Sequence, residues 1–128
     1  MDFSSFPPNF ADIGAQFVQH YYQTLMNKGD MISLYNDYAL MSYEGAQVQG
    51  KESIKAEFEK RTWKTLQVSV TNSDYQPIEN GVLILVTGQM RADSDAALPF
   101  SETFVLKKES NGSFSIFNTV FRILIHNF

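Results

Sequence analysis

The chain has 128 residues, a formal net charge of -4 at pH 7 and no cysteine. This length suits one domain that buries its own core, and 44% hydrophobic residues predict a folded chain rather than a disordered one. Without cysteine, disulfides and thiolate metal sites are excluded. The acidic balance, with no sizeable basic cluster, disfavours nucleic acid as a partner. No signal-peptide pattern and no run of about 18 apolar residues occurs, so we expect no membrane partner.

The first part of the chain predicts a lead-in and two helices. Residues 1–8 contain two prolines and are expected to be irregular, so that a single domain runs from 9 to 128. Asn9 is placed to cap a first helix, whose apolar residues recur every four positions: Ile13, Phe17, Tyr21 and Leu25. After Gly29, which is expected to end that helix, Asp30 is expected to start a short second helix carrying Ile32, Leu34 and Tyr35.

The rest of the chain predicts one more helix and a series of strands. A short strand is expected at 39–43 and a third helix at 51–61, with Ile54 and Phe58 facing inward and the charged residues in solvent. From Trp63 onward, apolar residues alternate with polar ones, which is typical of strands. The predicted strands are 66–70, 82–86, 100–107 and 113–125, with turns at 77–81 and at Asn111–Gly112.

The stretch from Gly81 to Asp95 organises the expected fold. Its unbroken apolar run, Val82 to Val86, is typical of a strand buried on both faces. The last strand is also apolar on both faces, yet three short helices cover only one face of a sheet. Leaving the other face in water would expose more than the roughly few hundred Å² that monomers tolerate. We therefore expect an α+β fold, in which a curved antiparallel sheet cups three N-terminal helices and forms a homodimer through the sheet faces.

Motifs for catalysis are missing from the sequence. It contains no nucleophile elbow, no zinc-binding HExxH and no phosphate-binding loop, so we assign no catalytic residue, no metal and no cofactor. His20 lies off the apolar stripe of the first helix, and His126 lies near the chain end. An enzyme with a cavity carboxylate stays an alternative, with Asp74 beside Tyr75, or His20 beside Tyr21, as the pairs to nominate.

Acidic residues gather at the predicted ends of two strands. Glu44 follows one strand, and Asp93 with Asp95 follows another, so neighbouring strand ends are expected to set three negative charges around one rim of the cup. Such a rim suits a protein partner that inserts an aromatic side chain and surrounds it with lysine or arginine. Three aromatic residues also stand where core packing does not require them: Phe10, Phe121 and Phe128.

Four blocks of the sequence resemble the nuclear transport factor 2 family. They are IGAQFVQHYYQ in the first helix, YEGAQVQGK after the first strand, VTGQMRADSD in the organising stretch and FRILIHNF at the end, and the similarity runs from about Phe10 to Phe128. The resemblance implies a homodimeric α+β cone without enzymatic activity that carries GDP-bound Ran into the nucleus. Such a carrier occupies cytoplasm and nucleus, is enriched at the nuclear pore, and binds the phenylalanine–glycine repeats of nucleoporins.

The resemblance also implies roles for individual residues. Glu44, Asp93 and Asp95 match the acidic residues that pair with basic side chains of Ran around an inserted phenylalanine of its switch region. Phe10 stands where the family has the aromatic residue that grips repeat phenylalanines. The predicted repeat-binding residues are Phe10, Phe121, Arg122 and Phe128.

Two positions depart from the family pattern. Val68 stands where histidine is frequent, which predicts a more apolar cavity, and Thr119 stands where aspartate is frequent. Two further functions occur on the same fold. One is an enzyme of the ketosteroid isomerase or scytalone dehydratase type, and the other is a scaffold subunit of the messenger-RNA export type. The acidic rim argues against the export scaffold, which lacks it.

Overall fold

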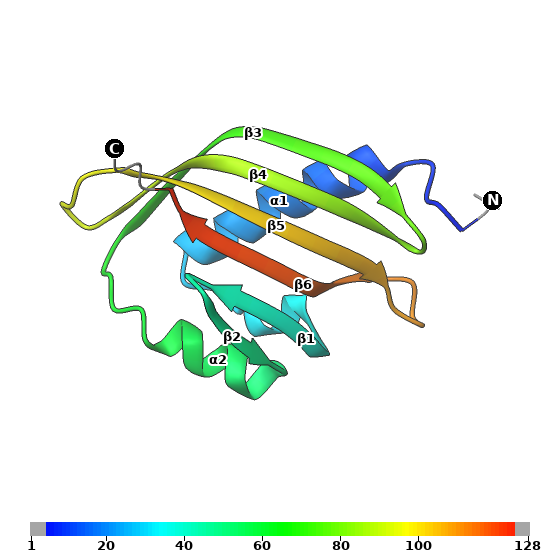
Figure 1. Ribbon diagram of the computed structural model, residues 1–128, viewed down its shortest axis with the longest axis horizontal. Helices are drawn as coiled ribbons and strands as arrows, with labels where there is room; N and C mark the ends of the chain where they lie inside the picture. Colours follow the sequence, from blue (N-terminus) through cyan, green and yellow to red (C-terminus); the bar gives the residue numbers. More distant parts are fainter. Residues whose placement is uncertain (1–4, 125–128) are drawn as a thin grey trace.

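The computed structural model describes residues 5–124, which form two α-helices and a six-stranded curved sheet (Figure 1). In chain order the elements are α1 (Phe10–Met26), the 3₁₀ turn η1 (Ile32–Leu34), β1 (Tyr35–Tyr43), β2 (Ala46–Gln49), α2 (Lys51–Glu59), β3 (Leu66–Ile78), β4 (Gly81–Ala92), β5 (Leu98–Lys108) and β6 (Phe114–Ile123). Across the sheet the strand order is β2-β1-β6-β5-β4-β3. α1 packs on β3 and β4, and α2 packs on β1 and β2.

The sheet is not wholly antiparallel as expected. Every neighbouring pair runs antiparallel except β1 and β6, which run parallel. β1 and β6 can run parallel because residues 44–113, which contain α2 and four strands, connect them, and two parallel strands need a long connection. Tyr43 at the end of β1 lies opposite Phe121, and Leu66 at the start of β3 lies opposite Ala92. As a result, β1, β4 and β6 all finish at the same end of the sheet, where the site described below lies (Figure 1).

The first predicted helix is confirmed as α1. Val18, Tyr21 and Leu25 are buried on its inner face, as the four-residue period predicts, while its outer residues are exposed. The helix also approaches β3 closely at Gly14. A Cβ atom on Gly14 would lie 2.3 Å from Cδ1 of Tyr75, so a larger residue would push the helix off the strand.

The second predicted helix is wrong. Residues 32–34 form only the 3₁₀ turn η1, and Tyr35 already belongs to β1. Asp30 does accept a hydrogen bond from the Ser33 backbone N–H at 3.2 Å, as a cap would. A segment this short cannot offset the cost of starting an α-helix, and Tyr35 gains more by pairing with Ile116 and burying its ring.

The third predicted helix is confirmed as α2, with one difference in its charged residues. Ile54 is fully buried on its inner face, as expected. Glu57, predicted to be solvated, is only 9% exposed and bonds Lys60 at 2.9 Å, because the short helix lies flat on β1 and β2. The pair is one turn apart on the helix, where side chains reach each other.

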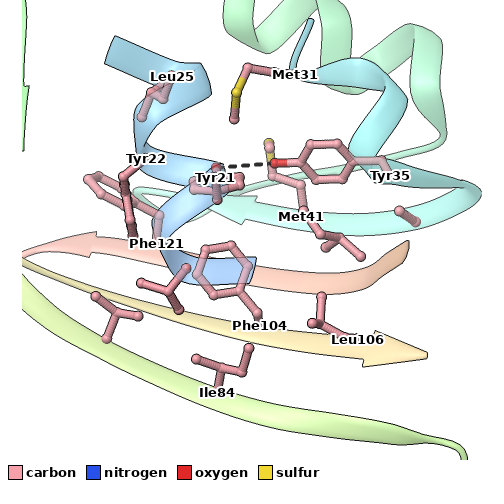
Figure 2. Packing of buried hydrophobic residues seen from close by; sticks show 14 of the residues in the cluster. Tyr21, Tyr22, Leu25, Met31, Tyr35, Met41, Ile84, Phe104, Leu106 and Phe121 are labelled. Carbon is pink, nitrogen blue, oxygen red and sulfur yellow. Dashed lines mark hydrogen bonds between the residues drawn. The ribbon is translucent and has the colours of Figure 1, made fainter. Parts of the chain in front are cut away.

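The core lies between α1 and the concave face of the sheet (Figure 2). Ile84 and Phe104 point into it from β4 and β5 and are fully buried, and the ring of Tyr21 meets Phe104 edge-on at 4.8 Å. Burying such large side chains stabilises the fold by roughly 2–3 kcal/mol each. This layer of aromatic and aliphatic groups holds α1 against the sheet.

The organising strand is buried on one face of this chain and open on the other. Val82, Ile84 and Val86 are fully buried, but Leu85 between them is 42% exposed. The outer face of β1 and β6 is similar, with Leu40 and Val120 almost half exposed. Burial on both faces therefore does not occur within one chain, and the apolar outer face is left without cover.

Candidate functional site

A small cavity lies at the end of the sheet where β1, β4 and β6 finish. Its volume is about 30 Å³, close to the share of one water molecule in the liquid. Its lining comes from α1, the sheet and the segment between α2 and β3, and includes Tyr21, Tyr43, Arg61, Trp63, Glu102 and Phe121. Pockets for small-molecule ligands usually measure about 300–1,000 Å³, so the cavity as it stands has no room for one.

Glu102 supplies a polar group deep in this cavity. It alternates inward along β5 with Phe100 and Phe104 and is only 5% exposed. Its carboxylate accepts hydrogen bonds from the hydroxyls of Tyr22 at 2.8 Å, Thr119 at 3.1 Å and Tyr21 at 3.4 Å. These donors offset part of the cost of placing a carboxyl group in an apolar core.

Burial raises the pKa of Glu102 from 4.5 to about 7, because the charged form loses its hydration in the core. The donated hydrogen bonds and the positive charge of Arg61 act in the opposite direction and limit the rise. Burial also raises the pKa of the Tyr21, Tyr22 and Tyr35 phenols, with a further contribution from the Glu102 charge. The phenols therefore stay protonated, and Tyr21 and Tyr35 bond each other at 3.3 Å (Figure 2).

Arg61 lies across the cavity wall, held mainly by aromatic rings. Its guanidinium carbon is 3.8 Å from the centre of the Tyr43 ring and 4.4 Å from that of Phe58, which are cation–π distances. Its Nε and Nη2 atoms are buried and have no hydrogen-bond partner among residues 5–124. The cavity therefore contains one cation, Arg61, and one buried acid, Glu102, which do not form an ion pair within 4 Å of each other.

Val68 does not contribute to the cavity lining as expected, and a more apolar cavity stays a prediction. Val68, the departure on which it rested, is not among the residues that line the cavity, and its backbone N–H instead contacts the sulfur of Met26 at 3.3 Å. Thr119, the second departure, is buried and serves Glu102 as a donor. The polarity of the cavity comes from Glu102 and Arg61, which were not predicted.

Glu44 lies at the predicted end of β1, in the tight turn to β2. It has a positive φ of 51°, and Gly45 follows with a φ of 86°, so the chain reverses sharply there. The Glu44 side chain is exposed, and its Oε1 accepts a hydrogen bond from the backbone N–H of Ile123 at the end of β6. One carboxylate thus joins the ends of two strands and still faces solvent.

Asp93 and Asp95 occupy the turn between β4 and β5, at the same end of the molecule as Glu44 (Figure 1). Asp93 Oδ1 accepts hydrogen bonds from the backbone N–H groups of Lys64 at 2.9 Å and Thr65 at 3.0 Å. These bonds hold the pKa of Asp93 below its usual value. Asp95 is exposed, and its backbone N–H donates a hydrogen bond to the carbonyl of Ala92.

The predicted repeat-binding residues do not gather on one chain. Phe10 is half-buried at the start of α1, whereas Arg122 is exposed at the end of β6, toward the opposite end of the molecule (Figure 1). Phe121 is only 4% exposed and stacks on Tyr43 at 4.8 Å, so its ring is not available to an external repeat on this chain. Phe128 lies outside the described residues.

Residues nominated for an enzyme do not form a site. His20 and Asp74 are both exposed, on α1 and β3 respectively. Within residues 5–124, no group of histidine and acidic residues is arranged to hold a metal ion. In the same part of the chain, no helix is both long and apolar enough to cross a membrane.

Comparison with known proteins identifies the family. Residues 13–123 match the family model of the nuclear transport factor 2 (NTF2) domain. The chain is 33% identical to a probable nuclear transport factor 2 of Caenorhabditis elegans, over 96% of this chain and 98% of that relative. The chain belongs to the nuclear transport factor 2 family. Nuclear transport factor 2B of Arabidopsis thaliana is 32% identical, over 87% of this chain and 91% of its own length.

Solved structures give the same assignment. Nuclear transport factor 2 from Cryptosporidium parvum has a TM-score of 0.89 at 38% identity, over 93% of this chain and 98% of that chain. A putative dehydratase from Streptomyces avermitilis has a TM-score of 0.75 at 11% identity, which shows a common fold alone. The predicted family and α+β fold are confirmed. As a member of this family, the chain acts in transport between cytoplasm and nucleus and is not an enzyme.

Proposed function

We propose that the chain is an import carrier that binds GDP-bound Ran at the cavity and returns it to the nucleus. The observation that carries this proposal is the placement of Glu44, Asp93 and Asp95 at the one end of the sheet where the cavity lies. Two separate turns deliver these carboxylates, and all three are exposed. A partner with lysine or arginine around an aromatic side chain fits this arrangement, because the charges complement each other around an apolar centre.

A homodimer formed through the outer sheet faces is part of this proposal. Leu40, Leu85 and Val120 are exposed on the convex face, and each is between 42% and 48% accessible. A second copy presents the same patch, so a two-fold contact covers both at once.

Binding of nucleoporin repeats is the second interaction of the proposed carrier. Phe10 is its main residue, because it is half-buried at the start of α1 and therefore held in place while part of its ring stays accessible. Arg122 and Phe128 are the further candidates. Because Phe10 is far from the acidic rim, we expect the two interactions to be separable by mutation, and the carrier to be enriched at nuclear pores.

Glu44→Lys tests the Ran site, with Glu44→Gln as its matched control. The reversal places a cation where the partner brings one and is expected to cost about 2–5 kcal/mol, on the order of thirty-fold or more in affinity. Glutamine retains an oxygen for the Ile123 backbone N–H and should lose less. Isothermal titration calorimetry with GDP-bound Ran measures both. Unchanged affinity of the folded Glu44→Lys variant would exclude this role for Glu44.

A further inference from the structure

The cavity is too small for the group it is proposed to receive. A ring the size of benzene occupies a site of about 150 Å³, whereas this cavity measures about 30 Å³. The space beside the Tyr43 ring is taken by the guanidinium group of Arg61, which is 3.8 Å from the ring centre. An arginine side chain of the protein itself therefore stands where an incoming apolar side chain needs room.

Arg61 is held there by rings and by long-range charge rather than by hydrogen bonds. Tyr43 and Phe58 both lie within cation–π distance of its guanidinium, but Nε and Nη2 are buried with no partner among residues 5–124. These two atoms form the edge of the guanidinium that donates two parallel hydrogen bonds when an acceptor is present. If the Arg61 side chain left this position, Nε and Nη2 could hydrogen-bond to water, and this gain would offset part of the lost ring contacts.

The backbone around Arg61 allows such a movement. Residues 60–65 contain neither helix nor strand and join α2 to β3. The far end of this segment is held by Asp93, which accepts hydrogen bonds from Lys64 and Thr65. Within residues 5–124, Arg61 is held by its contacts with two rings and by one turn hydrogen bond to Phe58. The segment is therefore anchored at the rim and free to adjust at Arg61.

A larger groove lies next to the cavity and shares Arg61 with it. It measures about 350 Å³, and its lining combines apolar side chains, such as Leu25, Met31 and Phe58, with the charged residues Lys28, Asp30, Lys55 and Glu59. Leu25, Arg61 and Trp63 line both this groove and the small cavity. The side chains of Arg61 and Trp63 thus form part of the wall between the two spaces, and displacing Arg61 toward the groove would enlarge the cavity without disturbing the sheet.

We infer that Arg61 is an internal occupant of the cavity that a partner's aromatic side chain must displace, so that Arg61 sets the affinity and selectivity of the site. This inference rests on the proposed function, since it describes how the same cavity receives its partner. In the free carrier, Arg61 therefore partly blocks the cavity from within. An aromatic ring of the partner replaces the contacts of Arg61 with Tyr43 and Phe58, and basic groups of the partner add their own pairing with the acidic rim.

The charge balance of the cavity supports the same conclusion. The groups that face Glu102 are Tyr21, Tyr22, Thr119 and Arg61, and Arg61 is the cation among them. Its departure removes a charge that lowers the pKa of Glu102, so the acid takes up a proton and becomes neutral near pH 7. A neutral cavity floor suits an apolar ring better than a carboxylate does.

Titration of GDP-bound Ran into wild type, Arg61→Ala and Lys64→Ala tests the inference. Lys64→Ala removes one positive charge from the same exposed segment and serves as the matched control. Arg61→Ala is expected to bind at least about tenfold more tightly, and Lys64→Ala to change affinity less than about twofold. Equal or weaker binding by Arg61→Ala would overturn the inference. An equal gain in Lys64→Ala would also overturn it, since net charge would then explain the effect.

A second measurement does not depend on Ran. Toluene, which has the shape of a phenylalanine side chain, is titrated while NMR follows the indole N–H signal of Trp63, the single tryptophan of the chain. For Arg61→Ala, we expect the Trp63 signal to shift and saturate as toluene is added. Wild type and Lys64→Ala should bind toluene with at most about a tenth of the affinity of Arg61→Ala. Identical toluene binding by all three proteins contradicts an occupied cavity. If wild type fails to bind Ran, the proposed function fails, while the toluene result still decides the role of Arg61.

Discussion

Glu102 should make the stability of this protein depend on pH in an unusual direction. Its carboxyl group is buried at the floor of the cavity, and burial raises its pKa from 4.5 to about 7. Between these two values the folded protein holds a proton that the unfolded chain has released. The free energy of unfolding therefore falls as pH rises through this range, because stability falls wherever the folded state binds more protons.

The size of this effect follows from the two pKa values. One pH unit corresponds to about 1.4 kcal/mol, and the interval from 4.5 to about 7 therefore amounts to about 3 kcal/mol. The contribution of Glu102 is fully favourable below pH 4.5 and is lost by the time the pH exceeds 7. Asp93 does not interfere in this window, since its pKa is lowered from 3.8 and its contribution changes only under more acidic conditions.

Glu102→Gln isolates the effect, because glutamine keeps the shape and an acceptor for Tyr22 but does not titrate. Urea unfolding of both proteins between pH 4.5 and 8, at one protein concentration, gives the difference in their free energies of unfolding. We expect this difference to shift in favour of Glu102→Gln by about 3 kcal/mol over the range. A difference that is constant with pH would refute the argument that burial sets the pKa of Glu102.

Three further predictions follow from the core, the outer face and the repeat site. Phe104→Ala should lower the free energy of unfolding by about 3–5 kcal/mol, because the ring is fully buried between α1 and the sheet; a loss below about 1 kcal/mol in urea unfolding would contradict this packing. Leu85→Glu should convert the proposed dimer into a monomer in size-exclusion chromatography with light scattering, whereas a monomeric wild type would rule out the sheet-face contact. Phe10→Ala should reduce retention on phenylalanine–glycine repeat resin and leave Ran binding intact, and equal loss of both would point to unfolding.

Much of the fold was predictable where one face of an element is buried. α1 and α2 show a helical period because their inner residues alone meet the core, and β5 alternates for the same reason. β2 was missed because three of the four residues of this edge strand are exposed, so no alternation marks it. β3 was predicted only at 66–70, since its continuation to Ile78 is an exposed edge with mixed residues.

The candidate site was predictable in part. Glu44 and Asp93 were found because each directly follows an apolar strand, and the sheet order then places both at one end. Glu102 had a usable signal, since an acid that alternates with Phe100 and Phe104 must share their buried face. The sequence gives no such signal for Arg61, because its position is typical of the end of a charged surface helix. Its inward position depends on a ring from β1, which is distant in the sequence.

Binding of wild-type protein to Ran in its GDP and GTP forms tests the central claim most directly. The account predicts that GDP-bound Ran binds at least about tenfold more tightly than GTP-bound Ran, because a ligand discriminates between two conformations only where its contacts with them differ. Parallel titrations of the two forms under identical salt conditions give the comparison. Equal affinity for both forms, or no binding to the GDP form, would contradict the account.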